Sequence, residues 1–290
     1  MGQLSNLFRR IGIRPARREA RPLNRLELHV THACNLVCES CSHYSNHGHV
    51  GNLDLGSAGR WMAAWSDRLV PEEFVLLGGE PTIHPQLPEF VTLARENWPL
   101  ARIRIVTNGF FLHRHPDLPM KLTAAGNADL ALSVHHNESD YLERLRSVFD
   151  LLAGWQRDHG TIVHTWPSHD GWTRRYHGFG AEMQPFEDGQ PRQSWEICPA
   201  RYCKQLHDGK IWKCAPLAYL GLQKAKYQLS DKWAPYLRYR PLEPTCTDDE
   251  LDEFLAREDE PVCSMCSAEP RHFSLPNPLR RALRPAAKQP

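Results

Sequence analysis

The sequence of 290 residues has no long apolar run and no strong excess of charge of either sign. No stretch reaches the roughly 18 apolar residues that a membrane-spanning helix needs. The first 24 residues also contain no apolar signal segment. The formal net charge of +1 gives no general reason to expect a nucleic-acid partner. We therefore expect a cytoplasmic protein that has neither a membrane nor a nucleic acid as its partner.

Cysteine, by contrast, is plentiful and unevenly placed. Three of the nine cysteines lie within residues 34–41, six lie beyond residue 197, and the middle of the chain has none. Disulfides are rare in cytosolic proteins. Two groups of thiols separated by such a long gap therefore favour metal binding.

Strand and helix patterns alternate through the first part of the chain. Strands are expected at 26–31, 74–77, 103–107, 130–135 and 161–166, and helices at 57–69, 87–98, 119–125 and 141–155. This alternation is typical of an α/β fold with a parallel sheet and crossover helices. Such sheets bind ligands at the carboxyl ends of their strands. The polar residues that follow these strands should therefore face one opening.

The regular pattern fades after residue 168, and a cysteine-rich module follows. Its centre, residues 203–214, predicts a β-hairpin that turns at His207-Asp208-Gly209. We expect five segments in all: a basic N-terminal tail (1–24), an α/β core (25–168), a bridge (169–194), the cysteine-rich module (195–275) and a C-terminal tail (276–290).

The first group of cysteines follows a predicted strand. Cys34, Cys38 and Cys41 have the spacing C-x3-C-x2-C. Three thiolates at this spacing can bind three irons of a [4Fe-4S] cluster and leave the fourth iron open. An open metal position is what a catalytic site needs. The alternative is a zinc site completed by one nearby histidine, His32, His43 or His47.

Two motifs now carry a resemblance to a known family. The segment CNLVCESC (34–41) and the segment GGEP (78–81) resemble the two sequence signatures of the radical S-adenosylmethionine (SAM) superfamily. The resemblance covers roughly residues 25–167. It implies a partial (β/α)6 TIM-like barrel in which SAM binds the open iron and is cleaved to a 5′-deoxyadenosyl radical that removes a substrate hydrogen. It also implies a reductase partner such as flavodoxin or ferredoxin.

The resemblance further implies which residues bind SAM. They are Gly78, Gly79, Glu80, Thr107, Asn108 and Ser133. The glycines would let the backbone approach the ligand, and Glu80 would accept a hydrogen bond from its ammonium group. Residue 40 departs from the family, because a serine stands where an aromatic residue near the adenine is usual. His43 or Tyr44 is expected to replace that contact, and we assign it to Tyr44.

The second group of cysteines resembles the twitch module, a shortened SPASM domain. This resemblance implies one auxiliary [4Fe-4S] cluster with four ligands, Cys198, Cys214, Cys263 and Cys266. Cys203 is an alternative to Cys198 as the first ligand. A structural zinc ion is an alternative to the cluster, because four thiolates also suit zinc.

Cys246 is the remaining thiol with a predicted role. A thiol can quench a carbon radical by giving a hydrogen atom, so Cys246 is predicted to make the reaction an epimerisation. The chain length, the single auxiliary cluster and this lone thiol are similar to those of aminoglycoside epimerases of the neomycin type. The expected substrate is therefore an aminoglycoside or sugar-like natural product.

Three other functions stay open. The enzyme could be a dehydrogenase of an aminocyclitol or sugar alcohol, with the auxiliary cluster as electron acceptor. It could modify a peptide, for example as a peptide epimerase. Outside enzymes, it could be an interaction protein that folds around zinc. For a cationic aminosugar, the bridge offers carboxylates and an aromatic wall, namely Asp170, Trp172, Glu182, Glu187 and Asp188. His135 and His136 are further candidate substrate contacts.

Overall fold

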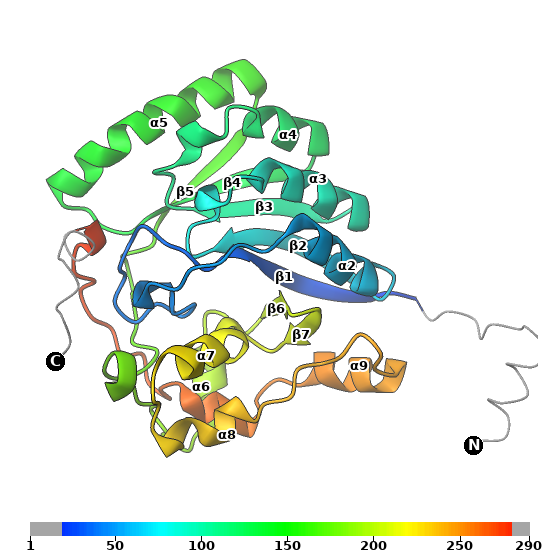
Figure 1. The fold of residues 1–290 in the computed structure, drawn as a ribbon, viewed down its shortest axis with the longest axis vertical. Coiled ribbons are helices and arrows are strands. Elements are labelled where there is room, and N and C mark those ends of the chain that lie inside the picture. The colour runs from blue at the N-terminus through cyan, green and yellow to red at the C-terminus, as the bar shows by residue number, and fades with distance from the viewer. Residues whose placement is uncertain (1–18, 280–290) are drawn as a thin grey trace, which may run out of the picture.

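The computed structural model describes residues 19–279, which form a seven-stranded sheet in the order β5-β4-β3-β2-β1-β6-β7 (Figure 1). The first five strands are β1 (Arg21–Thr31), β2 (Leu69–Gly78), β3 (Arg102–Thr107), β4 (Ala128–Val134) and β5 (Ile162–Pro167). Each pairs in parallel with its neighbour. The predicted α/β class with an open, partial-barrel sheet is confirmed.

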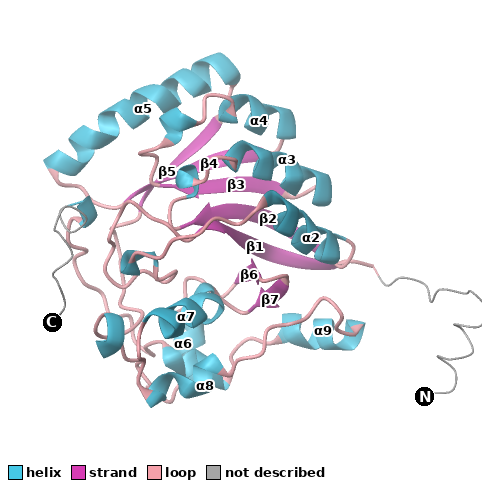
Figure 2. Cartoon of the chain, in the orientation of Figure 1, coloured by secondary structure: helices cyan, strands magenta, loops and turns pink. Residues whose placement is uncertain are grey.

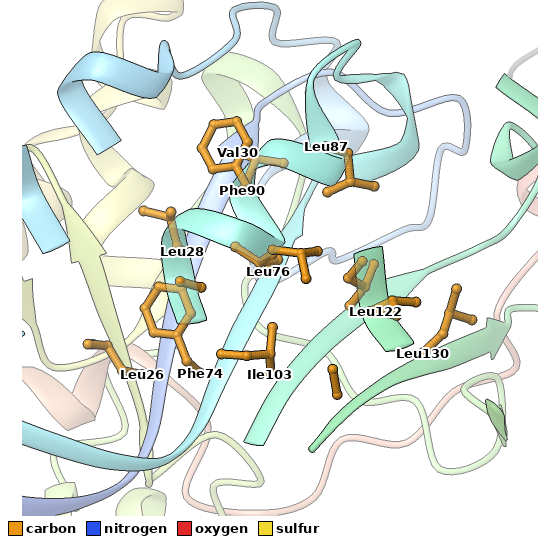
Figure 3. Close-up of a cluster of buried hydrophobic side chains, with 14 of the residues drawn as sticks. Leu26, Leu28, Val30, Phe74, Leu76, Leu87, Phe90, Ile103, Leu122 and Leu130 are labelled. Atoms are coloured by element: carbon orange, nitrogen blue, oxygen red, sulfur yellow. The ribbon is translucent and has the colours of Figure 1, made fainter. Parts of the chain in front are cut away.

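Four helices connect these strands and cover one side of them (Figure 2). They are α2 (Leu55–Ser66), α3 (Leu87–Asn97), α4 (Leu118–Ala125) and α5 (Ser139–His159). Alternate residues of each strand face the helices, among them Leu28, Leu76 and Ile103, and all three are fully buried (Figure 3). Burying one such side chain stabilises the fold by about 1.5–3 kcal/mol. This apolar layer therefore fixes the strands whose ends carry the site.

The boundaries differ from the prediction at the start of the chain. β1 begins at Arg21, inside the expected tail, because Arg21 pairs with Leu69 in the sheet and its guanidinium binds Asp252 at 2.7 Å. α2 ends at Ser66 and β2 begins at Leu69, so the predicted helix ran three residues too far. The rest of the basic N-terminal tail and the last residues of the C-terminal tail lie outside the described residues.

The other side of the strands carries charge near their amino ends. Arg25 Nη2 lies 2.6 Å from Glu73 Oε2, and Arg104 Nε lies 2.7 Å from Asp129 Oδ1. Arg102 also binds Asp129, which is almost fully buried. Arg104 and Asp129 are buried, and their opposite charges satisfy one another. The carboxyl ends of the strands are left for ligands.

The cysteine-rich module continues the same sheet. The predicted hairpin is confirmed as β6 (Cys203–His207) and β7 (Lys210–Trp212), with positive φ at Asp208 and Gly209 as a two-residue turn of this type requires. β6 pairs in parallel with β1, so the sixth parallel strand lies beside β1 and not beyond β5.

Four further helices complete the module below β1 (Figure 1). They are α6 (Pro191–Glu196), α7 (Ala215–Lys226), α8 (Ala234–Leu237) and α9 (Asp248–Ala256). Tyr219, Leu220 and Trp233 form the buried centre of a second apolar cluster there. Within residues 19–279, no helix combines the length and the apolar character needed to cross a membrane.

Candidate active site

A cavity of about 210 Å³ lies at the carboxyl ends of β1 to β4. Its lining includes all three front cysteines and most of the predicted cofactor residues, namely Cys34, Cys38, Cys41, Gly78, Gly79, Glu80, Thr107, Asn108 and Ser133. These residues come from the loop after β1 and from the ends of β2, β3 and β4. The fold therefore gathers them as a parallel sheet predicts.

The two glycines are required by contacts between protein segments. Gly79 N donates to Thr31 O and Glu80 N donates to Ala33 O, each at 2.8 Å. A Cβ atom on Gly79 would lie 2.2 Å from Ala33 O, and one on Gly78 would lie 2.5 Å from Thr31 O. Close approach to a ligand was the expected reason for these glycines. In the structure, the lack of a Cβ instead lets the turn pack closely against the backbone at the start of the cysteine loop.

Glu80 joins two strand ends. One carboxylate oxygen accepts from Thr82 N at 3.0 Å and from the hydroxyls of Thr82 and Thr107, and the other accepts from Asn108 N at 2.7 Å. The side chain is almost fully buried, and burial raises its pKa although these hydrogen bonds oppose the rise. Glu80 therefore positions the Thr107-Asn108 turn, a role that the motif alone did not predict.

The front thiols lie in a buried setting. Burial raises the pKa of Cys34, Cys38 and Cys41, so binding iron has to displace their protons. His135 Nδ1 lies 3.6 Å from Cys38 Sγ, and burial lowers the pKa of this imidazole to about 4. A neutral ring at this distance can donate to a Cys38 thiolate. His135 thus contacts a predicted ligand, although a substrate contact was expected.

The predicted adenine contact is corrected by the structure. Tyr44 does not line the cavity, because its ring is buried against Tyr176 and its hydroxyl donates to Pro216 O at 3.3 Å. His43, the alternative from the sequence, does line it. Burial lowers the pKa of His43 to about 4, so its ring is neutral at pH 7.

The four rear cysteines come together in a second place. Cys198, Cys214, Cys263 and Cys266 all line one cavity of about 40 Å³ between α6, α7 and the last cysteine turn. Burial raises the pKa of Cys214, and burial with the neighbouring thiols raises that of Cys266 to about 12. Cys203 lies apart from them on β6, with its sulfur 3.9 Å from Arg25 Nη1. This placement favours Cys198 over Cys203 as the fourth member of the set.

The three front cysteines and the four rear cysteines are spread around their respective cavities. Within residues 19–279, no three His, Cys, Asp or Glu side chains converge closely enough to hold a single metal ion. A cubane cluster takes one thiolate on each iron, so its ligands surround a cluster and do not converge on one ion. The donor sets of three and of four thiols are the types that such clusters use.

Cys246 lines neither cavity. Its sulfur accepts from Arg68 Nη1 at 3.2 Å, immediately before β2 begins. The front cavity lies at the other end of that ten-residue strand, a distance of about 30 Å at the usual rise per residue. Hydrogen-atom transfer needs contact between the thiol and the carbon radical. The predicted donor role of Cys246 is therefore corrected.

A larger cavity of about 510 Å³ adjoins the front one, and Trp172 lines both. His136, His169, Asp170 and His272 also line it, so the predicted His136, Asp170 and Trp172 are brought together. The other bridge carboxylates are engaged elsewhere or do not reach it. Glu187 binds Lys232 at 2.8 Å, and Asp188 accepts from Ala268 N at 2.8 Å. Glu182 does not line this cavity.

A strap crosses between these cavities. We define it as residues 171–175 together with residues 270–273, which pair at Thr173 and His272. It is anchored on the cysteine loop, because Trp172 Nε1 donates to Glu39 O at 2.8 Å and Arg174 binds the Glu39 carboxylate at 2.7 Å. This strap could not be predicted from the sequence, because its two halves lie almost a hundred residues apart and follow no regular pattern.

Part of the chain is similar to curated proteins. The chain is 31% identical over 100 residues to a GTP 3′,8-cyclase of Chlorobaculum tepidum, covering 34% of this chain and 30% of that protein. It is 32% identical over 132 residues to a probable GTP 3′,8-cyclase of Saccharolobus solfataricus, covering 45% and 41%. The matches thus span less than half the length of these curated relatives.

A solved structure and a family model also match this chain. A crystal structure of BtrN in complex with AdoMet and 2-DOIA has a TM-score of 0.50 and 21% identity, covering 85% of this chain and 94% of that one. At this identity the likeness concerns the fold alone. Residues 28–150 match the model of the Radical SAM superfamily. The matched residues include the front cysteines and the Gly-Gly-Glu turn, so this part of the chain is similar to the Radical SAM superfamily at the front site.

Proposed function

We propose that this protein is a radical SAM enzyme that oxidises a polar, sugar-like small molecule, with a second iron-sulfur cluster as electron acceptor. The observation that carries the proposal is the arrangement of three cavities, two of which adjoin. The front cavity holds three thiols, the rear cavity holds four, and the cavity of about 510 Å³ borders the front one at Trp172. A substrate in this cavity of about 510 Å³, which we call the substrate cavity, would lie beside the front site.

The front residues fit the cofactors that the superfamily implies. Cys34, Cys38 and Cys41 would hold a [4Fe-4S] cluster and leave one iron for SAM. When bound, the cluster and SAM together supply the 5′-deoxyadenosyl radical that removes a hydrogen atom from the substrate. The chain's own part is to hold SAM and exclude water. Gly79 N and Glu80 N already bind Thr31 O and Ala33 O, and Glu80 O accepts from Ile83 N at 3.1 Å. The Gly79 carbonyl is therefore the group of this turn that would accept from the SAM ammonium.

The later strand ends would hold the rest of SAM. Thr107, Asn108 and Ser133 line the front cavity at the ends of β3 and β4, where hydroxyl and amide groups can bind the ribose and the carboxylate. His43 would lie against the adenine in place of Tyr44. Its neutral ring suits this contact, because a charged ring would be costly at so buried a place.

The rear residues fit a second cluster. Four thiols in a small apolar cavity are the donor set of a closed [4Fe-4S] site. Such a cluster would supply a one-electron acceptor. Oxidation is favoured over epimerisation because Cys246 lies at the opposite end of β2. Neither Cys246 nor Cys203 lines the substrate cavity.

The substrate cavity suits a hydroxylated molecule. Asn137, Asp170 and Ser274 offer hydrogen-bonding groups, and Trp172 and Phe273 offer aromatic walls. Sugars combine polar edges with apolar ring faces, and such a lining matches both. The GTP 3′,8-cyclases match over too little of their length for their substrate to be carried over.

Iron analysis after anaerobic reconstitution tests the two sites. The full chain should bind about eight irons and eight sulfides, with absorbance near ~400 nm. Cys198→Ala should reduce this to about four and keep the cleavage of SAM to 5′-deoxyadenosine. Cys203→Ala is the matched control and should keep the full iron content. Zinc in place of iron, or equal iron loss in both variants, would contradict the proposal.

Product analysis in deuterated water separates oxidation from epimerisation. An oxidised product loses two hydrogens and takes up no solvent deuterium at the reacting carbon. An epimer keeps its mass and gains one deuterium from a solvent-exchanged donor. A deuterated epimer formed by the full chain would therefore replace dehydrogenation with the alternative that the sequence first suggested.

A further inference from the structure

A further cavity, of about 290 Å³, lies between the strap and the rear cysteines. Arg175 and Arg271 line it from the strap, and Cys198 and Cys266 line it from the rear site. It adjoins the substrate cavity, because Gly171 and His272 line both. The proposed function assigns no role to this space, which we call the arginine cavity.

The charges in the arginine cavity are not balanced. Arg174 also lines it, but its guanidinium binds Glu39 at 2.7 Å and lies over the Phe273 ring at 4.2 Å. Arg271 has Glu269 at 3.6 Å. The guanidinium of Arg175 has no hydrogen bond or ion pair with the described residues. The positive charge of Arg175 also acts on the Cys266 sulfur of the rear site. The lining still holds three arginines against one carboxylate, Glu269, and an anion in the cavity would balance this excess of positive charge.

Arg175 is held in place by its backbone. Its N–H donates to Ser40 Oγ at 2.6 Å, and Ser40 stands next to the front ligand Cys41. This contact gives a reason for the serine where the family usually has an aromatic residue. Arg175 also lies three residues after Trp172, at most about 10 Å along an extended chain. That distance is close to the length of one sugar ring with a charged group attached.

We propose that the arginine cavity binds an anionic group of the substrate, and that the substrate is a sugar or polyol carrying a phosphate or a carboxylate. Arg175 would bind the anion in a forked contact, as guanidinium groups do with phosphate and carboxylate, and Arg271 would stand beside it. This inference rests on the proposed function, because it names the substrate class of the same site. It replaces the cationic aminosugar that the sequence suggested.

Ligand binding tests this inference on the reconstituted full chain with SAM present. The probes are glucose 1-phosphate, glucuronate, glucose and glucosamine, and isothermal titration calorimetry gives their affinities. We expect one of the two anionic probes to bind more tightly than glucose, and which one it is distinguishes phosphate from carboxylate. Arg175→Ala should weaken that binding about tenfold or more, and Arg175→Lys should restore part of it.

A matched control comes from α5. Arg146 is exposed, and its ion pair within residues 19–279 is with Glu143 on the same helix. Arg146→Ala should therefore bind the anionic probe as the unchanged chain does. Equal affinities of Arg175→Ala and the unchanged chain would overturn the inference, as would tighter binding of glucosamine than of both anions. Iron content and 5′-deoxyadenosine formation by the unchanged chain are measured alongside. If both are normal and no anion binds, the inference fails while the proposed function stands.

Discussion

Gly79 sits where the turn after β2 meets the start of the cysteine loop. Its N–H and that of Glu80 donate to carbonyls of the loop at 2.8 Å. These two bonds set the separation between the cysteines and the strand ends that face them. These two backbone hydrogen bonds therefore help to set the geometry of the front cavity.

Gly79→Ala should disrupt this contact. The new Cβ would lie 2.2 Å from Ala33 O, which is backbone and cannot move aside cheaply. We expect a loss of about 2–4 kcal/mol in the free energy of unfolding and weaker SAM binding, measured by urea denaturation and calorimetry. Gly221→Ala on α7 is the control. Nothing lies within 4 Å of its Cβ, so stability should stay the same or rise by up to about 1 kcal/mol.

Cys246→Ala should leave the chemistry intact. Arg68 and the start of α9 surround this thiol, far from the cavities. We expect unchanged iron content, 5′-deoxyadenosine yield and product, measured by chromatography and mass spectrometry. A variant that still made 5′-deoxyadenosine but no product would restore the hydrogen-donor role that the structure argues against.

Among the larger elements, the strap matters most for the site. It joins three cavities, and it rests on the cysteine loop through Glu39 and Ser40. Its two halves come from the bridge and from the end of the chain, and they meet at Thr173 and His272. A substitution that moves the cysteine loop should therefore also move the strap residues that line the substrate cavity.

Ser40→Ala should loosen the strap. The substitution removes the acceptor for Arg175 N, and an unsatisfied amide at a partly buried place costs about 1–3 kcal/mol. Hydrogen exchange should therefore become about tenfold faster or more at residues 172–175. Ser66→Ala, on the exposed end of α2, is the control and should leave this exchange unchanged. Unchanged exchange in Ser40→Ala would mean that the contacts of Trp172 and Arg174 with Glu39 hold the strap without the Ser40 hydrogen bond.

At the scale of the whole molecule, several buried histidines join the half-barrel to the rear module. His29 Nδ1 lies 2.9 Å from His32 Nδ1, and the His29 ring stacks on Tyr219 of α7 at 4.3 Å. His47 bonds Tyr176 at 3.2 Å and stacks on Phe179. Polar contacts of neutral rings thus fill much of the space between the two parts.

Acid should therefore destabilise the protein. Burial lowers the pKa of His47 from 6.5 to about 3, so the unfolded chain takes up this proton first as the pH falls. The stability that this group contributes is complete above pH ~6.5 and is lost toward pH ~3, by at most about 1.4 kcal/mol per pH unit. Urea denaturation between pH 7 and 5 checks this. His47→Gln should show a shallower slope, and equal slopes would exclude His47 as a cause.

The periodic pattern of apolar residues predicted the helices and strands of the core. The predicted strands and helices of the core are all present, because each has a buried face with a clear period. Short motifs also predicted the front cavity, since ligands that follow neighbouring parallel strands must meet. The errors at Ser66 and Arg21 arose where sheet pairing with distant residues decided the boundary.

The sequence by itself determined which side chains can bind metal, the α/β core, the hairpin and the meeting of the front cysteines with Gly78, Gly79 and Glu80. These follow from spacing and periodicity, which are properties of neighbouring residues. Only the tertiary structure decided the places of Tyr44, Cys246 and Arg175. Their surroundings come from the pairing of β6 with β1 and from the strap. Such contacts join residues that are far apart in the sequence, so they produce no periodic pattern in it.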